Sequence, residues 1–101
     1  MTGAPTRVGT VKAVHPARRE AAIAPEPGAQ REFAGRQWLW FAAEGQHPPR
    51  RYKIESIHTD DNAVRIRFAP GVPRDDVAAL HGAAVFIPED ERRGPSPEDY
   101  G

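Results

Sequence analysis

Proline and glycine interrupt the chain along its whole length, and this limits what it can fold into. They account for 11 and 9 of its 101 residues, about a fifth of the sequence. Proline removes a backbone hydrogen-bond donor, and glycine weakens the interior of helices and strands. Long helices are therefore excluded, whereas short strands joined by turns fit the pattern. A chain of this length forms one domain, and we predict that this domain is all-β.

The charges of the chain cancel, but they are unevenly distributed. Its 14 basic and 14 acidic residues give a formal net charge of zero, which excludes a nucleic-acid-binding protein that depends on bulk positive charge. Residues 88–101 carry five acidic and two basic residues, a net charge of −3, so residues 1–87 carry +3. A mildly basic domain is thus followed by an acidic, proline-rich tail. We expect residues 1–6 and 91–101 to be flexible.

Several classes of site are excluded by the residue types that are present. The chain has no cysteine, which rules out disulfides, thiolate zinc sites and a cysteine nucleophile. Its four histidines are scattered over expected turns, so we predict no metal site and no other cofactor. No phosphate loop, nucleophile elbow or opposed carboxylate pair is present, so we predict no catalytic residue, no small-molecule substrate and no enzymatic activity. The absence of an 18-residue apolar run and of a signal pattern predicts a cytoplasmic protein without membrane contact.

Short runs with alternating polar and apolar residues predict six strands and one helix. The strands are expected at residues 7–14, 20–24, 37–42, 51–57, 63–69 and 83–87. The helix begins near Pro73 and ends before Gly82, since these residue types favour a first turn and a C-terminal cap. Six short strands with one short helix before the last strand are typical of a small six-stranded Greek-key β-barrel.

Alternation also predicts which side chains of the fourth and fifth strands face outwards. If the apolar residues of both strands face one core, Ile54 lies opposite Ile66, and the connecting loop has an odd number of residues. In that arrangement Arg65 and Arg67 point to solvent. Arg18, Arg19, Arg50 and Arg51 flank loops. Together with Arg65 and Arg67 they are candidates for a few contacts with RNA phosphates, although a solvated polar face is the simpler interpretation.

The most aromatic stretch, residues 38–41, alternates in the same way. Leu39 and Phe41 share one face, so Trp38 and Trp40 lie on the other. If the first pair faces the core, both indoles lie outside the barrel. There they are either covered by residues 25–35 or by the tail, or available for protein docking or base stacking.

Taken in order, these segments resemble the N-terminal domain of the ribosome maturation factor RimM. The resemblance lies in Arg51-Tyr52-Lys53-Ile54-Glu55-Ser56-Ile57, Val64-Arg65-Ile66-Arg67-Phe68, Arg74-Asp75-Asp76-Val77-Ala78-Ala79-Leu80-His81-Gly82-Ala83, Val85-Phe86-Ile87-Pro88 and Val8-Gly9-Thr10-Val11, with His15, Arg18 and Glu20 matching a family motif near the first turn. It spans about residues 7–90, and its order makes it more specific than any single motif. It implies a barrel like that of translation factors.

The resemblance also implies a function. The family is a non-enzymatic factor that assists assembly of the head of the 30S subunit and 16S rRNA processing, binding a ribosomal protein and lying near 16S rRNA. We therefore expect its partner to be the small ribosomal subunit. Separately, we expect the protein to be a monomer. The candidate partner-binding residues are His15, Arg18, Arg19, Glu20, Trp38, Trp40, Arg65 and Arg67.

Two departures from the family pattern stand out. Pro16 and Arg19 occupy positions where the family usually carries glycine, which changes a turn near these candidate contacts. The family also continues into a second domain, a PRC barrel, near paired tyrosines, whereas here Tyr100 is followed by the last residue given, Gly101. A shortened chain and a natural single-domain relative both fit. The alternative function is a stand-alone adaptor that binds a non-ribosomal protein through an exposed tryptophan patch.

Overall fold

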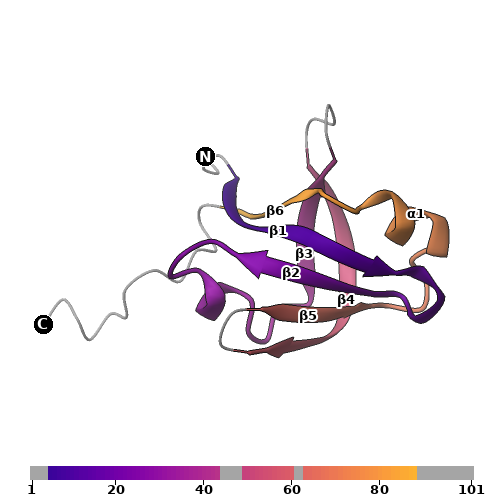
Figure 1. The fold of residues 1–101 in the computed structure, drawn as a ribbon, viewed down its shortest axis with the longest axis horizontal. Helices are drawn as coiled ribbons and strands as arrows, with labels where there is room; N and C mark the ends of the chain where they lie inside the picture. Colours follow the sequence, from indigo (N-terminus) through magenta and orange to yellow (C-terminus); the bar gives the residue numbers. More distant parts are fainter. Residues whose placement is uncertain (1–4, 44–48, 61–62, 89–101) are drawn as a thin grey trace, which may run out of the picture.

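Six strands close into one antiparallel barrel in the order β1-β2-β5-β4-β3-β6, as seen in a computed structural model that describes residues 5–43, 49–60 and 63–88 (Figure 1). The elements are β1 (Thr6–His15), η1 (Pro16–Arg18), β2 (Glu20–Pro25), η2 (Gln30–Glu32), β3 (Trp38–Ala42), β4 (Arg50–Thr59), β5 (Val64–Phe68), α1 (Arg74–Ala79) and β6 (Ala84–Ile87). β3, β4 and β5 follow one another, and β6 returns to lie beside β3, which is a Greek-key connection. The all-β prediction is confirmed, including the single α-helix before the last strand.

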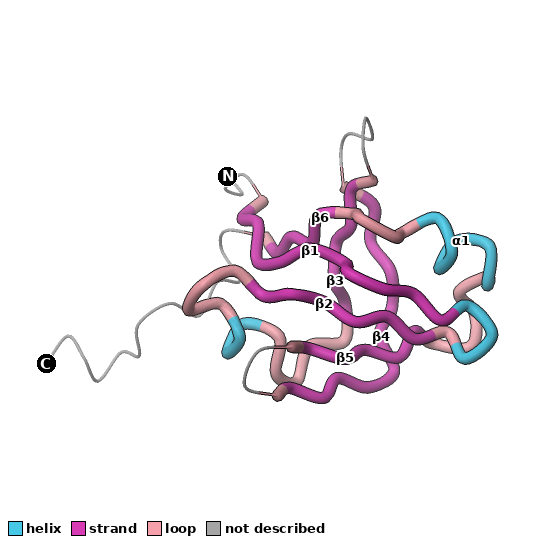
Figure 2. Tube along the Cα trace, in the orientation of Figure 1, coloured by secondary structure: helices cyan, strands magenta, loops and turns pink. Residues whose placement is uncertain are grey.

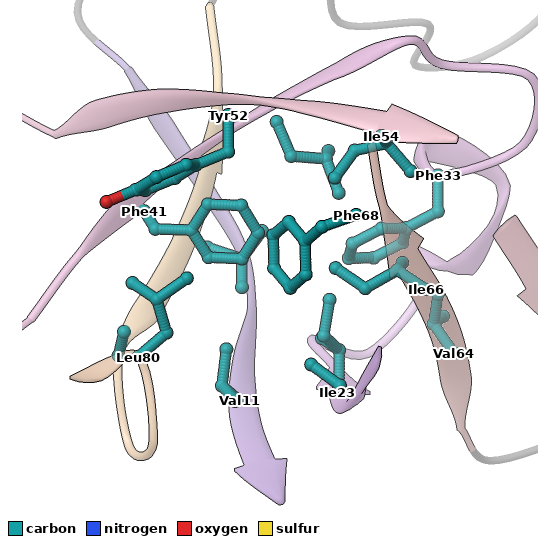
Figure 3. Close-up of a cluster of buried hydrophobic side chains, with 14 of the residues drawn as sticks. Val11, Ile23, Phe33, Phe41, Tyr52, Ile54, Val64, Ile66, Phe68 and Leu80 are labelled. Atoms are coloured by element: carbon teal, nitrogen blue, oxygen red, sulfur yellow. The ribbon is translucent and has the colours of Figure 1, made fainter. Parts of the chain in front are cut away.

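The inner faces of the strands form one apolar core. Leu39, Phe41, Val85 and Ile87 are fully buried, as alternation predicts. Three rings from β3, β4 and β5 meet in its centre (Figure 3). The ring centroids of Phe41, Tyr52 and Phe68 lie 5.5–6.0 Å apart in tilted or edge-on pairs, geometries that aromatic quadrupoles favour.

The helix α1 and the short helix η1 lie at the same end of the barrel (Figure 2). α1 follows Pro73, as predicted, and buries Val77 against the core. Leu80, at its C-cap, is also buried, and Gly82 in the following turn has a φ of +82°. The predicted helix is therefore confirmed, with its apolar side closing this end of the barrel.

The predicted register between β4 and β5 is wrong. Ile54 lies opposite Phe68, and Ile57 lies opposite Ile66. The register shifts between Ile54 and Ser56, which marks a β-bulge, and such bulges bend strands where a sheet closes into a barrel. The bulge adds one residue to β4, so the pairing beyond it is shifted by one. Thr59 pairs with Val64, and the loop between them has four residues, an even number where an odd number was predicted. The predicted faces survive this change: Arg65 and Arg67 are both exposed.

Gly9 allows β1 to approach its neighbour closely, as a glycine inside a strand suggests. A Cβ built at this position would lie 2.8 Å from the carbonyl oxygen of Ala24 and 2.8 Å from a side-chain carbon of Ile23. The register with β6 also shifts between Arg7 and Gly9. The close contact therefore involves backbone that cannot rotate out of the way.

We expect Gly9→Ala to lower the free energy of unfolding by about 1–3 kcal/mol, the usual cost of overpacking. Urea denaturation followed by circular dichroism measures this change. Gly71→Ala is the matched control, because a Cβ there meets nothing within 4 Å and should be neutral or slightly stabilising. Equal effects at the two glycines would contradict the proposed steric cause.

Candidate functional site

Four candidate residues lie around the turn between β1 and β2. His15 and Arg18 are exposed, whereas Arg19 and Glu20 are half-buried. His15 and Glu20 are cross-strand partners, so the first turn does bring them together.

Glu20 is engaged by an arginine from a different strand. Arg67 of β5 donates from a terminal guanidinium nitrogen to the Glu20 carboxylate at 2.8 Å, because β2 and β5 pair Glu20 with Arg67. This hydrogen bond and the charge of Arg67 lower the pKa of the Glu20 carboxyl below its ordinary value of 4.5, against the opposing effect of desolvation. More weakly, Arg18 and Arg65 act in the same direction. Glu20 and Arg67 lie 47 residues apart in the chain, and they come into contact because β2 pairs with β5.

We expect Arg67→Gln to raise the pKa of Glu20 towards 4.5, measured by NMR titration of the side-chain carboxyl. Folding lowers the pKa of Glu20, so the hydrogen bond from Arg67 stabilises the folded protein fully at a pH above the pKa that Glu20 has in the unfolded chain. This stabilisation is lost as the pH falls through the lower pKa that Glu20 has in the folded protein. Arg65→Gln is the control on the same strand, and it should raise the pKa less. A larger rise with Arg65→Gln would show that the hydrogen bond is not the main cause.

Arg19 adopts a conformation that usually requires glycine. Its φ is +52°, in the left-handed region, and it is the one residue other than glycine with a positive φ in the part of the chain that the structure describes. Its side chain donates from Nε to the carbonyl oxygen of Val72 at 2.9 Å. This bond joins the first turn to the segment before α1. Arg19 therefore occupies an αL position of the kind that favours glycine, and its side chain adds a tertiary contact.

Trp38 and Trp40 lie on the outer face of β3, as alternation predicts, and both are half-buried. The side chain over Trp38 comes from β4: the Arg51 guanidinium carbon lies 4.0 Å from the ring centroid. The Lys53 ammonium lies 5.8 Å from the same ring. Trp40 has Arg51 and Phe86 as its cross-strand partners. The tryptophans thus belong to a mixed aromatic and cationic surface.

Beside Trp38 the surface forms a groove of about 400 Å³, here called the cation–aromatic groove. It is lined by Trp38, Arg50, Arg51, Tyr52, Lys53, Ala69, Gly71, Val72, Pro73 and Asp76. Arg50 lies 5.3 Å from the ring centroid of Tyr52 and 3.9 Å from the Asp76 carboxylate. The Tyr52 hydroxyl points away from the other core rings (Figure 3) and donates to Asp76 at 3.5 Å.

The sequence analysis included Arg50 and Arg51 among the arginines that could contact phosphate, but it missed Lys53 and did not place these cations beside Trp38. The spacing in the sequence could have indicated them. Arg51 and Lys53 are two residues apart on β4 and therefore share one face of that strand, as Trp38 and Trp40 do on β3. The pairing of Trp38 with Lys53 and of Trp40 with Arg51 then brings the two sets together. The groove and the β5 arginines are separate parts of the surface, and Arg65 and Arg67 instead line a smaller hollow with Glu20, Ser56 and His58.

Neither a metal cluster nor a membrane-spanning helix is found in the described part of the chain. Within residues 5–43, 49–60 and 63–88, no group of three or more histidine, aspartate or glutamate side chains is arranged to hold a metal ion. In the same ranges no helix combines the length and apolar character that crossing a bilayer requires. His47 and the tail at 91–101 lie outside the described residues.

A family model described as the RimM N-terminal domain matches residues 6–92. The matched region contains every strand and helix named above, and both the first turn and the cation–aromatic groove. A search of curated proteins and a search of solved structures each returned no match.

Proposed function

The chain belongs to the RimM family through its N-terminal domain, and on this premise we propose that it is a non-enzymatic binding module in maturation of the small ribosomal subunit. The family match over residues 6–92 is the observation that carries the proposal. Its partners are a ribosomal protein of the 30S head and nearby 16S rRNA, and its effect is on subunit assembly and 16S rRNA processing.

The surface near the first turn supports this role. Arg18 and Arg65 are exposed and both act electrostatically on Glu20, so their positive charges converge on one region. Glu20 and Arg67 are joined to each other, which holds the acidic and basic groups in fixed positions. A surface with a few ordered arginines suits contacts with RNA phosphate or with a ribosomal protein that do not depend on net charge.

Co-sedimentation tests the proposal. Tagged protein is added to a cell lysate and the mixture is separated on a sucrose gradient at two salt concentrations. We expect the protein to travel with small-subunit precursors and expect Arg65→Glu plus Arg67→Glu to reduce its recovery. Protein that stays at the top of the gradient at both salt concentrations contradicts the proposed function.

The second candidate is an adaptor that binds a non-ribosomal protein. The observation that favours it is the half-buried aromatic surface of Trp40 and its neighbour Phe86 on the outside of the barrel, since tryptophan is enriched where proteins dock. The same lysate separates the two candidates. Purification of a single non-ribosomal protein, abolished by Trp40→Ala, would favour the adaptor over the ribosomal role.

A further inference from the structure

The cation–aromatic groove contains two arginine side chains, each lying over an aromatic ring. Arg51 lies 4.0 Å from the ring centre of Trp38, and Arg50 lies 5.3 Å from that of Tyr52. A planar guanidinium held over an aromatic ring presents a flat surface on its other side and keeps its N–H groups at the edge. The groove therefore offers flat surfaces with hydrogen-bond donors beside them.

The charge of the groove is positive. Arg50, Arg51 and Lys53 line it together with a single carboxylate, that of Asp76. This carboxylate already interacts with Arg50 at 3.9 Å and with the Tyr52 hydroxyl at 3.5 Å. Arg51 and Lys53 are exposed, so they meet an incoming anion first. The ligand that fits is negatively charged.

A nucleotide combines the two properties that the groove would recognise, since it has a flat base and an anionic phosphate. The carboxylates of an acidic peptide would pair with the lysine and the arginines, but such a peptide has no flat group to stack on the guanidinium surfaces. We infer that the cation–aromatic groove binds single-stranded RNA by stacking bases on the Arg51–Trp38 pair, while Lys53 and the guanidinium edges contact phosphates. This inference rests on the proposed function and assigns the RNA contact to a different surface from Arg65 and Arg67.

Base stacking without base-edge recognition has a recognisable binding signature. Single strands should bind better than duplexes, because bases in a duplex are already stacked on one another, and sequence preference should be weak. The affinity should fall with rising salt concentration, because phosphate contacts release counterions.

Tryptophan fluorescence can locate the RNA, because Trp38 and Trp40 are the only tryptophans of the chain. In the Trp40→Phe variant Trp38 is the sole tryptophan, and in the Trp38→Phe variant it is Trp40. Each variant is titrated with a uridine decanucleotide, with a duplex of the same length and with a polyglutamate peptide of similar charge. We expect the single-stranded RNA to quench Trp38 and the other two ligands to have little effect. Quenching of Trp40 alone, or equal quenching by the peptide, would overturn the inference.

The charge contacts are tested with the two lysines of the chain. Lys53→Glu changes the groove, and Lys12→Glu is its matched control, because both lysines are exposed on strands. We expect Lys53→Glu to weaken RNA binding and to lower the slope of log affinity against log salt by about 0.7 for each phosphate that the protein no longer neutralises. Lys12→Glu should leave the slope unchanged. Equal changes in both variants would show that only the overall charge matters.

Removal of the stacked ring gives a third measurement, read by fluorescence anisotropy of labelled RNA. Trp38→Ala should weaken binding by about 5- to 150-fold, the range for one stacked base, and a thermal melt checks that the variant is folded. If RNA binding is unaffected while the protein still travels with small subunits, the inference fails and the proposed function stands. If the groove binds RNA but no subunit is recovered, the proposed function fails instead.

Discussion

Phe68→Ala is expected to lower the free energy of unfolding by about 3–5 kcal/mol, the usual cost of removing a buried phenylalanine side chain. Phe68 is 1% exposed and packs against two other rings, with centroid distances of 5.5 Å to Phe41 and 6.0 Å to Tyr52. These three residues come from three different strands. The cavity left by the phenyl ring would therefore weaken the packing between three neighbouring strands of the barrel.

Urea denaturation measures this destabilisation, and Phe86→Ala is its control. Phe86 lies on the outer side of β6 and is half-buried, so the same change in side chain should cost less. The total stability of a domain of this size is only about 5–15 kcal/mol. Phe68→Ala thus removes a large part of it, and the midpoint of unfolding should move to much lower urea. Equal destabilisation at the two positions would mean that the three-ring cluster is not the centre of the core.

The faces of the strands could be predicted from sequence more easily than their pairing. Ile54 and Ile66 both face the core, as alternation indicates, but they are not opposite each other. The bulge lies between Ile54 and Ser56 of β4, and bulges bend strands as a sheet closes into a barrel. Bending of this kind depends on the other strands, so the local sequence carries little sign of it.

The candidate site shows the same limit. Alternation correctly placed Trp38 outside the barrel, yet its neighbours Arg51 and Lys53 come from the next strand. The connection between β3 and β4 is too long to set the pairing, because only tight turns fix a register. In the same way, Glu20 meets Arg67 because β2 pairs with β5, two strands that lie far apart in the chain. Residue types and faces were therefore accessible from sequence, and contacts between distant strands were not.

The second large effect is expected at a buried ion pair between β2 and β3. Arg36 and Glu32 lie 3.5 Å apart, and their side chains are only 8% and 6% exposed. Nε of Arg36 also donates to the carbonyl oxygen of Glu32. Phe33, between the two residues in sequence, is fully buried in the core. The ion pair therefore lies within a segment that contributes directly to the packing of the barrel.

Arg36→Met should destabilise the protein by about 3–5 kcal/mol, because it removes the Arg36 cation from beside the buried Glu32 carboxylate. The double variant Arg36→Met plus Glu32→Leu removes both charges and should recover most of this stability, since apolar replacements of buried ion pairs are often neutral. Arg7→Met is the matched control, because the Arg7–Glu26 pair is about half exposed and exposed pairs contribute little. Urea denaturation of the wild type, Arg36→Met, Glu32→Leu and the double variant forms a double-mutant cycle. If the double variant is as unstable as Arg36→Met, the arginine acts through packing and its hydrogen bond to the backbone, and neutralising the buried carboxylate is not its main contribution.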